Sequence, residues 1–161
     1  MKAGMPIAVG GVSYELQIAI DAPRERVWRA LLEEVGAWWL PDFHMVGEDS
    51  TVTFDARAGG SLIEHSEDGG SLLWMTVQWI RPQQFVLYAV GHVAPDWGGP
   101  SLYHFKLELE PREPDRCTLK VSDVHVGRVD ESSITSLKAG WTTLFSDGLK
   151  QFVERGVRYD H

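Results

Sequence analysis

The end of the chain carries an apolar stripe at helical spacing, and this stripe constrains the fold more than any other feature. Between Ser132 or Ser133 and Gly156, large apolar residues recur every three or four positions, which predicts a long amphipathic helix. They are Ile134, Leu137, Trp141, Leu144, Phe145, Leu149 and Phe152. Exposing such a face to water costs free energy, so another apolar surface has to cover it.

The residues before this helix predict a series of short strands. In 14–20, apolar residues alternate with polar ones, which is the pattern of a half-buried strand. Asp21 and Pro23 then favour a helix over 23–34, and a second short helical piece follows at 37–41 with two tryptophans. Turn residues separate the further strands, which we expect at 51–56, 62–66, 72–80, 85–90, 103–109 and 117–125.

This order of elements predicts an α+β domain in which a curved antiparallel sheet of about six to seven strands wraps around the long C-terminal helix. The length of 161 residues fits one domain, which we place at 12–156, with a loose segment at 1–11 and a tail at 157–161. A sheet curled around one helix leaves a gap at one end, and we expect the functional pocket there.

The charge balance argues against nucleic acid and membranes as partners. Lys and Arg total 15 and Asp and Glu total 23, which gives a net charge of −8. An acidic surface repels phosphate backbones and anionic lipid headgroups. No apolar run approaches the roughly 20 residues of a membrane helix. Cys117 alone cannot form an internal disulfide, so we expect a cytoplasmic protein of a reducing compartment.

Three polar side chains are predicted to face the interior. Glu64 shares strand parity with Leu62, and Asp123 and His125 share parity with Val121. A buried acid is costly unless it is paired or hydrated. If Glu64 or Asp123 orients His125, the pair can serve as a general acid and base of the kind that cyclases and dehydratases use beside a carbonyl. Hydrogen bonding to a ligand and simple solvent contact at a strand end are the alternatives.

The other residues predicted to bind a ligand are apolar or aromatic. Strand alternation over 72–80 predicts that Met75 and Trp79 point inward and that Trp74 points outward, under a loop or at a partner surface. On the terminal helix, Trp141 and Phe145 share a face. Core packing is the alternative role for such residues. The expected pocket lining is completed by Trp39, Phe43, Phe54, Tyr103 and Phe105.

No cofactor or metal is expected. The six histidines never fall at the two-to-four-residue spacing of zinc ligands, and no second cysteine supports them. The glycine pairs at 59–60, 69–70 and 98–99 mark turns and do not form a nucleotide-binding loop. Cys117 is interpreted as a small buried apolar residue.

Five short motifs, taken in order, resemble one known family. They are APRERVWRAL (22–31), WW (38–39), DARAGG (55–60), RPQQF (81–85) and GW (140–141). The set is similar to the family named after the activator of heat-shock protein 90 ATPase homologue, within the START-like or SRPBCC helix-grip superfamily. The resemblance runs over about 13–152. It implies a helix-grip domain with a cavity between sheet and terminal helix, where relatives bind lipids, hormones, polyketides or other apolar molecules.

Three function hypotheses follow. The first is a cytoplasmic, non-catalytic binding domain for a small apolar or aromatic molecule. The alternative is an enzyme of cyclase or dehydratase type that uses His125 with Glu64 or Asp123. A third is a protein-interaction module of co-chaperone type, homodimeric through the sheet surface that carries Trp74. The family's namesake has a separate domain for chaperone stimulation, and one domain fills this chain, which weighs against the third hypothesis.

Overall fold

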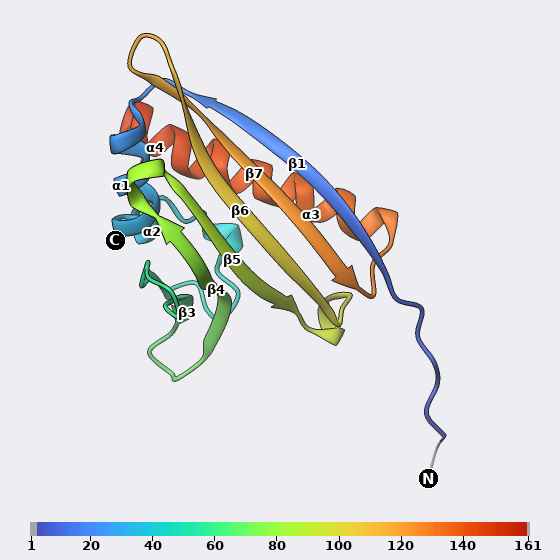
Figure 1. Ribbon diagram of the computed structural model, residues 1–161. Helices are drawn as coiled ribbons and strands as arrows, with labels where there is room; N and C mark the ends of the chain where they lie inside the picture. Colours follow the sequence, from blue (N-terminus) through green and yellow to red (C-terminus); the bar gives the residue numbers. More distant parts are fainter. Residues whose placement is uncertain (1–2, 161) are drawn as a thin grey trace.

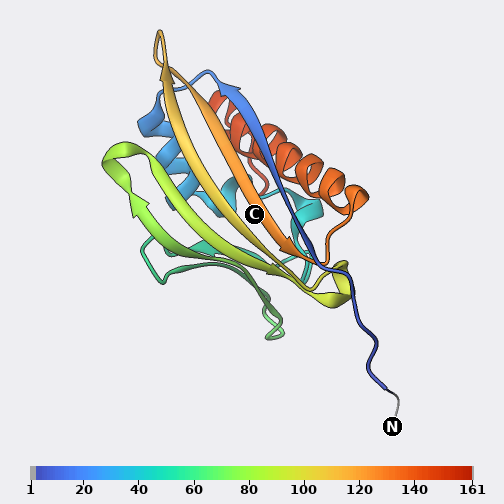
Figure 2. The same cartoon turned by 45° about the vertical axis from the view of Figure 1, so that its right-hand side comes forward.

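Seven antiparallel strands form one curved sheet in the computed structural model, which describes residues 3–160. The strand order is β1-β7-β6-β5-β4-β3-β2, so the first and last strands of the sequence are neighbours. Their bounds are β1 (Gly10–Ile20), β2 (Thr51–Phe54), β3 (Ser61–His65), β4 (Ser71–Arg81), β5 (Val86–Val93), β6 (Ser101–Arg112) and β7 (Arg116–Gly127). The sheet curves around the C-terminal helix (Figures 1 and 2).

One long helix and two short ones accompany the sheet. The short helices after β1 are α1 (Arg24–Glu33) and α2 (Val35–Trp38), and single 3-10 turns occur at η1 (Pro41–Phe43), η2 (Pro82–Gln84) and η3 (Pro95–Trp97). The long helix has three consecutive segments, which are α3 (Glu131–Thr143), the π-helical η4 (Leu144–Lys150) and α4 (Gln151–Arg155). The Asp130 carboxylate accepts a hydrogen bond from the Ser133 amide at 2.8 Å and so caps α3.

These elements confirm the predicted α+β helix-grip architecture, with two short helices after the first strand. β1 begins at Gly10, so the last residues of the segment expected to be loose belong to the sheet. In the expected tail, the Tyr159 amide donates to the Ala37 carbonyl at 2.9 Å. Residues 1–2 and 161 lie outside the described residues. Within 3–160, no helix has the length and apolar character that a membrane span requires.

A β-bulge in β4 turns Trp74 toward the interior. Two neighbouring residues of β3, Leu62 and Ile63, pair with Met75 and Leu73, which leaves Trp74 as the extra residue between them. An extra residue interrupts the strict alternation of side chains, so Trp74 packs against the same core as the buried Met75. The predicted outward orientation of Trp74 is therefore wrong, because the alternation rule does not hold across a bulge.

A second bulge in β4 places Trp79 on the outer face of the sheet. Val77 pairs with Ala89 and Trp79 with Tyr88, so Gln78 is the extra residue. Trp79 is 40% exposed, and its ring packs edge-to-face on Tyr88 with the ring centroids 4.9 Å apart. The predicted inward orientation of Trp79 is wrong for the same physical reason.

Candidate functional site

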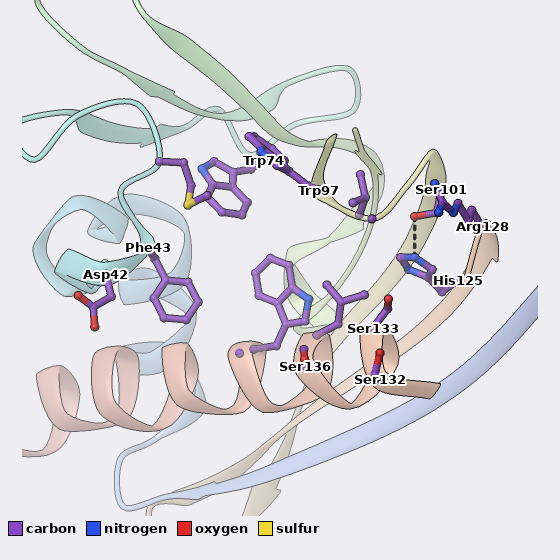
Figure 3. Close-up of a pocket in the computed structure, with 16 residues that line it drawn as sticks. Asp42, Phe43, Trp74, Trp97, Ser101, His125, Arg128, Ser132, Ser133 and Ser136 are labelled. Atoms are coloured by element: carbon purple, nitrogen blue, oxygen red, sulfur yellow. Dashed lines mark hydrogen bonds between the residues drawn. The ribbon is translucent and has the colours of Figure 1, made fainter. Parts of the chain in front are cut away.

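A pocket of about 500 Å³ opens between α3 and the sheet. Its walls come from η1 and the residues after it, from β4, from the β5–β6 loop with η3, and from the pocket-side ends of β6 and β7 (Figure 3). Ser133, Leu137 and Trp141 are spaced by four residues, which places them along one side of α3 and toward the pocket.

Aromatic side chains fill the interior beyond this pocket. Trp141 contacts Trp74 and Phe105 edge-to-face, with ring centroids 6.1 and 4.7 Å apart. Trp39 in turn contacts Trp74 at 5.2 Å. The cavity beneath these rings measures about 30 Å³. The space between sheet and helix is thus a packed core, and the pocket of about 500 Å³ lies at its open end.

One half of the pocket is apolar. Trp74 and Trp141 form its inner wall, and Phe43 projects into it from η1 (Figure 3). Trp97, in η3, is 53% exposed at the rim. An aromatic wall of this kind favours a flat apolar molecule, because aromatic rings gain from edge-to-face and offset stacking in addition to burial.

The other half of the pocket is polar and centres on His125. Its Nε2 lies 2.8 Å from the Ser101 Oγ at the start of β6, and both residues line the pocket (Figure 3). Its Nδ1 lies 3.5 Å from the Asp123 Oδ2. The Tyr103 ring stacks parallel to the imidazole, with centroids 6.2 Å apart. The Tyr103 hydroxyl donates to the Trp74 carbonyl, which ties this polar half to the aromatic wall.

Two further polar residues, Asp123 and Tyr14, lie behind His125 inside the protein. The Asp123 Oδ1 accepts from the His104 amide at 3.1 Å. Within the part of the chain that the structure describes, the Asp123 Oδ2, the His125 Nδ1 and the Tyr14 hydroxyl make no hydrogen bond. Burial raises the pKa of Asp123, an effect that Tyr14, His125 and the His104 amide partly offset. Burial and then the nearby Asp123 carboxylate raise the pKa of both Tyr14 and Tyr103.

Glu64 is fully buried but lies apart from His125. Its Oε1 accepts from the Met45 amide at 2.6 Å, the Val46 amide at 2.9 Å and the Ser50 hydroxyl at 2.7 Å. Its Oε2 accepts from the Trp74 Nε1 at 3.1 Å. The structure therefore brings Asp123 and His125 together, while Glu64 fixes the loop after η1 and the indole of the pocket wall.

The remaining predicted site residues divide between the pocket and the core. Phe43, His125 and Trp141 line the pocket, and Asp123 and Tyr103 lie next to His125. The small cavity beneath is lined by Trp39, Phe54, Met75, Phe105 and Phe145, together with Trp141. Trp79 lines neither cavity.

Sequence reasoning misses several residues of the pocket wall. Met45, Trp97 and Arg128 lie in connecting segments that carry no periodic pattern. Ser133 does carry a signal, because it stands four residues before Leu137 and eight before Trp141 on the predicted helix. Extending the apolar stripe of this helix back to Ser133 therefore predicts that this side of the helix forms a wall of the pocket.

Neither a cluster of metal-ligating side chains nor a thiol is found among the described residues that line the pocket. Within residues 3–160, no group of three or more His, Cys, Asp and Glu side chains is arranged to hold a metal ion. Cys117 is buried, and burial raises the pKa of its thiol to about 11, which keeps it protonated near neutral pH.

The curved sheet and the long helix, with the pocket at their open end, define a protein of the helix-grip fold class. The sequence profile described as Activator of Hsp90 ATPase homolog 1-like protein matches residues 21–154. The chain belongs to this family. A comparison with curated proteins finds no match.

Solved structures of the same fold include proteins of different kinds. A putative uncharacterized protein from Rhizobium leguminosarum has a TM-score of 0.67 at 19% identity, covering 92% of this chain and 97% of that one. Norcoclaurine synthase from Thalictrum flavum, in complex with dopamine and hydroxybenzaldehyde, has a TM-score of 0.61 at 14% identity, covering 95% and 94%. Ara h 8.0201 has a TM-score of 0.67 at 12% identity, covering 89% and 98%. At these identities the likeness shows the fold.

Proposed function

We propose that the protein binds a small apolar or aromatic molecule in the pocket between α3 and the sheet. The observation that carries this proposal is an open pocket of about 500 Å³ whose inner wall is aromatic, above an interior that is otherwise filled. Small-molecule sites usually measure about 300 to 1,000 Å³ and combine apolar walls with a few polar groups. The fold is compatible with ligand binding, and norcoclaurine synthase of the same fold was solved with two small aromatic molecules.

The apolar wall provides most of the free energy that useful affinity requires. Burying about 300 Å² of apolar surface contributes on the order of 7 kcal/mol before the cost of ordering the ligand. A net gain of about 8 kcal/mol corresponds to a micromolar dissociation constant. Stacking on Trp74 and Trp141 and one hydrogen bond to Ser101 or His125 would supply the difference.

Filling the pocket should weaken binding without unfolding the domain. We expect Leu137→Trp to weaken binding of the neutral dye Nile red at least about tenfold, because the added ring occupies the aromatic half of the pocket. Fluorescence titration measures the affinity, and native mass spectrometry of the freshly purified protein identifies any molecule that it retains. The matched control is Lys138→Trp, on the exposed side of α3. Equal affinity in both variants, at unchanged melting temperature, would contradict the proposal.

A second candidate function is acid–base catalysis beside a carbonyl group. The observation that favours it is the pair of buried side chains Asp123 and His125, 3.5 Å apart, with the imidazole in the pocket wall. Asp123 can orient the ring and balance its charge when it takes up a proton, and Ser101 can hold the Nε2 toward the pocket.

Hydrogen exchange at a ketone tests this function directly. With 2-tetralone in D₂O, we expect the protein to accelerate exchange of the hydrogens next to the carbonyl above the buffer rate, measured by NMR. His125→Gln should reduce the protein-dependent rate about 100-fold, the usual contribution of a positioned base. His92→Gln, on the exposed outer face, is the matched control. Exchange at the buffer rate, or exchange that survives His125→Gln, would exclude this function.

A further inference from the structure

We infer that the pocket selects a flat aromatic molecule that carries a carboxylate, and that Arg128 binds this carboxylate. The inference rests on the proposed binding function and names the ligand class for the same pocket. The pocket is divided into an aromatic half and a polar half. Phe43 and Trp74 lie toward one end, whereas Ser101, His125 and Arg128 lie toward the other (Figure 3).

Arg128 is a cation that has no counter-ion among the residues that the structure describes. It follows β7 and lines the pocket rim, and within residues 3–160 its guanidinium makes no ion pair. Most other cationic side chains that the structure describes form ion pairs, since acidic residues outnumber basic ones in this chain of net charge −8. Among the described residues that line the pocket, Asp42 is the one carboxylate, and it lies at the opposite end (Figure 3). The described residues that line the polar end therefore include one cation, Arg128, and no carboxylate.

Hydrogen-bond donors surround Arg128 on two sides. Ser133 and Ser136 project from α3 toward the pocket. The Ser136 hydroxyl has no hydrogen-bond partner among residues 3–160, whereas the Ser133 hydroxyl donates to the Asp130 carboxylate. Asp130, the acid next to them, is occupied because its Oδ1 accepts from the Ser132 hydroxyl and the Ser133 amide. On the sheet side, the buried His125 and Ser101 complete the end of the pocket. These groups match the oxygens of a carboxylate.

The charge and size of the site favour a carboxylate over a phosphate. One arginine, with no lysine in the pocket wall, neutralises a single negative charge. A phosphate carries more charge and is usually held by a glycine-rich loop or several cations. With the carboxylate at the polar end, the ring of the same molecule lies in the aromatic half of the pocket. There Trp74 and Trp141 contact the faces or edges of the ligand ring.

Two probes that differ in charge test the inference. In isothermal titration calorimetry at low salt, we expect 1-naphthaleneacetic acid to bind about tenfold more tightly than its neutral analogue 1-naphthaleneacetamide, as a charge-assisted bond implies. Arg128→Gln should remove this preference by weakening the acid alone, and Arg128→Lys should keep part of it. The matched control is Arg112→Gln, an exposed residue at the far end of β6 that forms no ion pair with any of residues 3–160.

The outcomes separate this inference from the proposed function. Equal binding of acid and amide overturns the carboxylate preference while the binding function stands. A preference for the acid that persists in Arg128→Gln overturns the role of Arg128. If neither naphthalene binds at millimolar concentration, the aromatic pocket proposal and this inference fail together. Loss of the acid preference in Arg128→Gln, with the amide affinity unchanged, supports both.

Discussion

Glu64 connects the pocket wall to the loop after η1 through one buried carboxylate. Its full burial agrees with the inward orientation that strand alternation predicts. The Ser50 hydroxyl donates its one hydrogen to Glu64, so it can only accept in its bond with His44. The imidazole is therefore the donor, which places the proton on the His44 Nδ1. Four donors therefore bind the Glu64 carboxylate, and both of its oxygens accept hydrogen bonds. One of these bonds positions the Trp74 indole.

Glu64→Gln should lower the free energy of unfolding by about 2 to 4 kcal/mol, because the amide nitrogen cannot accept from either the Trp74 indole or the backbone amides. Chemical denaturation measures the change. Glu67→Gln, at an exposed position in the following turn, should change stability by less than about 0.5 kcal/mol. Similar effects of the two substitutions would show that the Glu64 bonds contribute little.

The long C-terminal helix changes its winding where it contacts α2. Leu144, Phe145 and Leu149 of the π-helical segment η4 are buried, whereas most residues of α3 remain partly exposed beside the pocket. Gly148 lies against α2, and a Cβ at this position would come within 2.5 Å of the Trp38 carbonyl oxygen. The close approach of two backbones therefore requires glycine there.

Gly148→Ala should lower the free energy of unfolding by about 1 to 3 kcal/mol, because the methyl group forces η4 away from α2. Gly140→Ala is the matched control in the same helix. Its Cβ would meet only the Phe43 ring, at 4.0 Å, and we expect stability to stay the same or rise by about 0.5 kcal/mol. Thermal and chemical denaturation distinguish the two. A stable Gly148→Ala variant would mean that the helix shifts at little cost.

At the same scale, the sequence indicates most elements but not their irregularities. Period-two alternation identifies the strands and the apolar stripe identifies the helix, because both patterns arise from local geometry. The bulges at Trp74 and Gln78 depend on how β4 pairs with β3 and β5, which are distant partners. Local alternation carries no information about them, and this is why Trp74 and Trp79 exchange the sides predicted for them.

At the scale of the whole molecule, the pocket depends on contacts between distant parts of the chain. Phe43 follows the first helices, Trp97 lies in the β5–β6 loop, and Arg128 and Trp141 come from the end of the sequence. The predicted fold places the pocket at the open end of the sheet, where it is found. Strand alternation predicts His125 at its polar end but not Ser101 or Arg128, because these two residues acquire their neighbours only when β6 and β7 pair in register.

Four tryptophan side chains in the aromatic core lie close enough to exchange excitation energy. Trp38 contacts Trp39, Trp39 contacts Trp74, and Trp74 contacts Trp141, with ring centroids 5.2 to 6.1 Å apart. At such separations, excitation energy passes between neighbouring rings faster than it is emitted as light. A bound molecule that quenches only the outermost ring would therefore also reduce emission from rings deep inside the protein. The native chain thus carries its own built-in fluorescent reporter for events at the pocket.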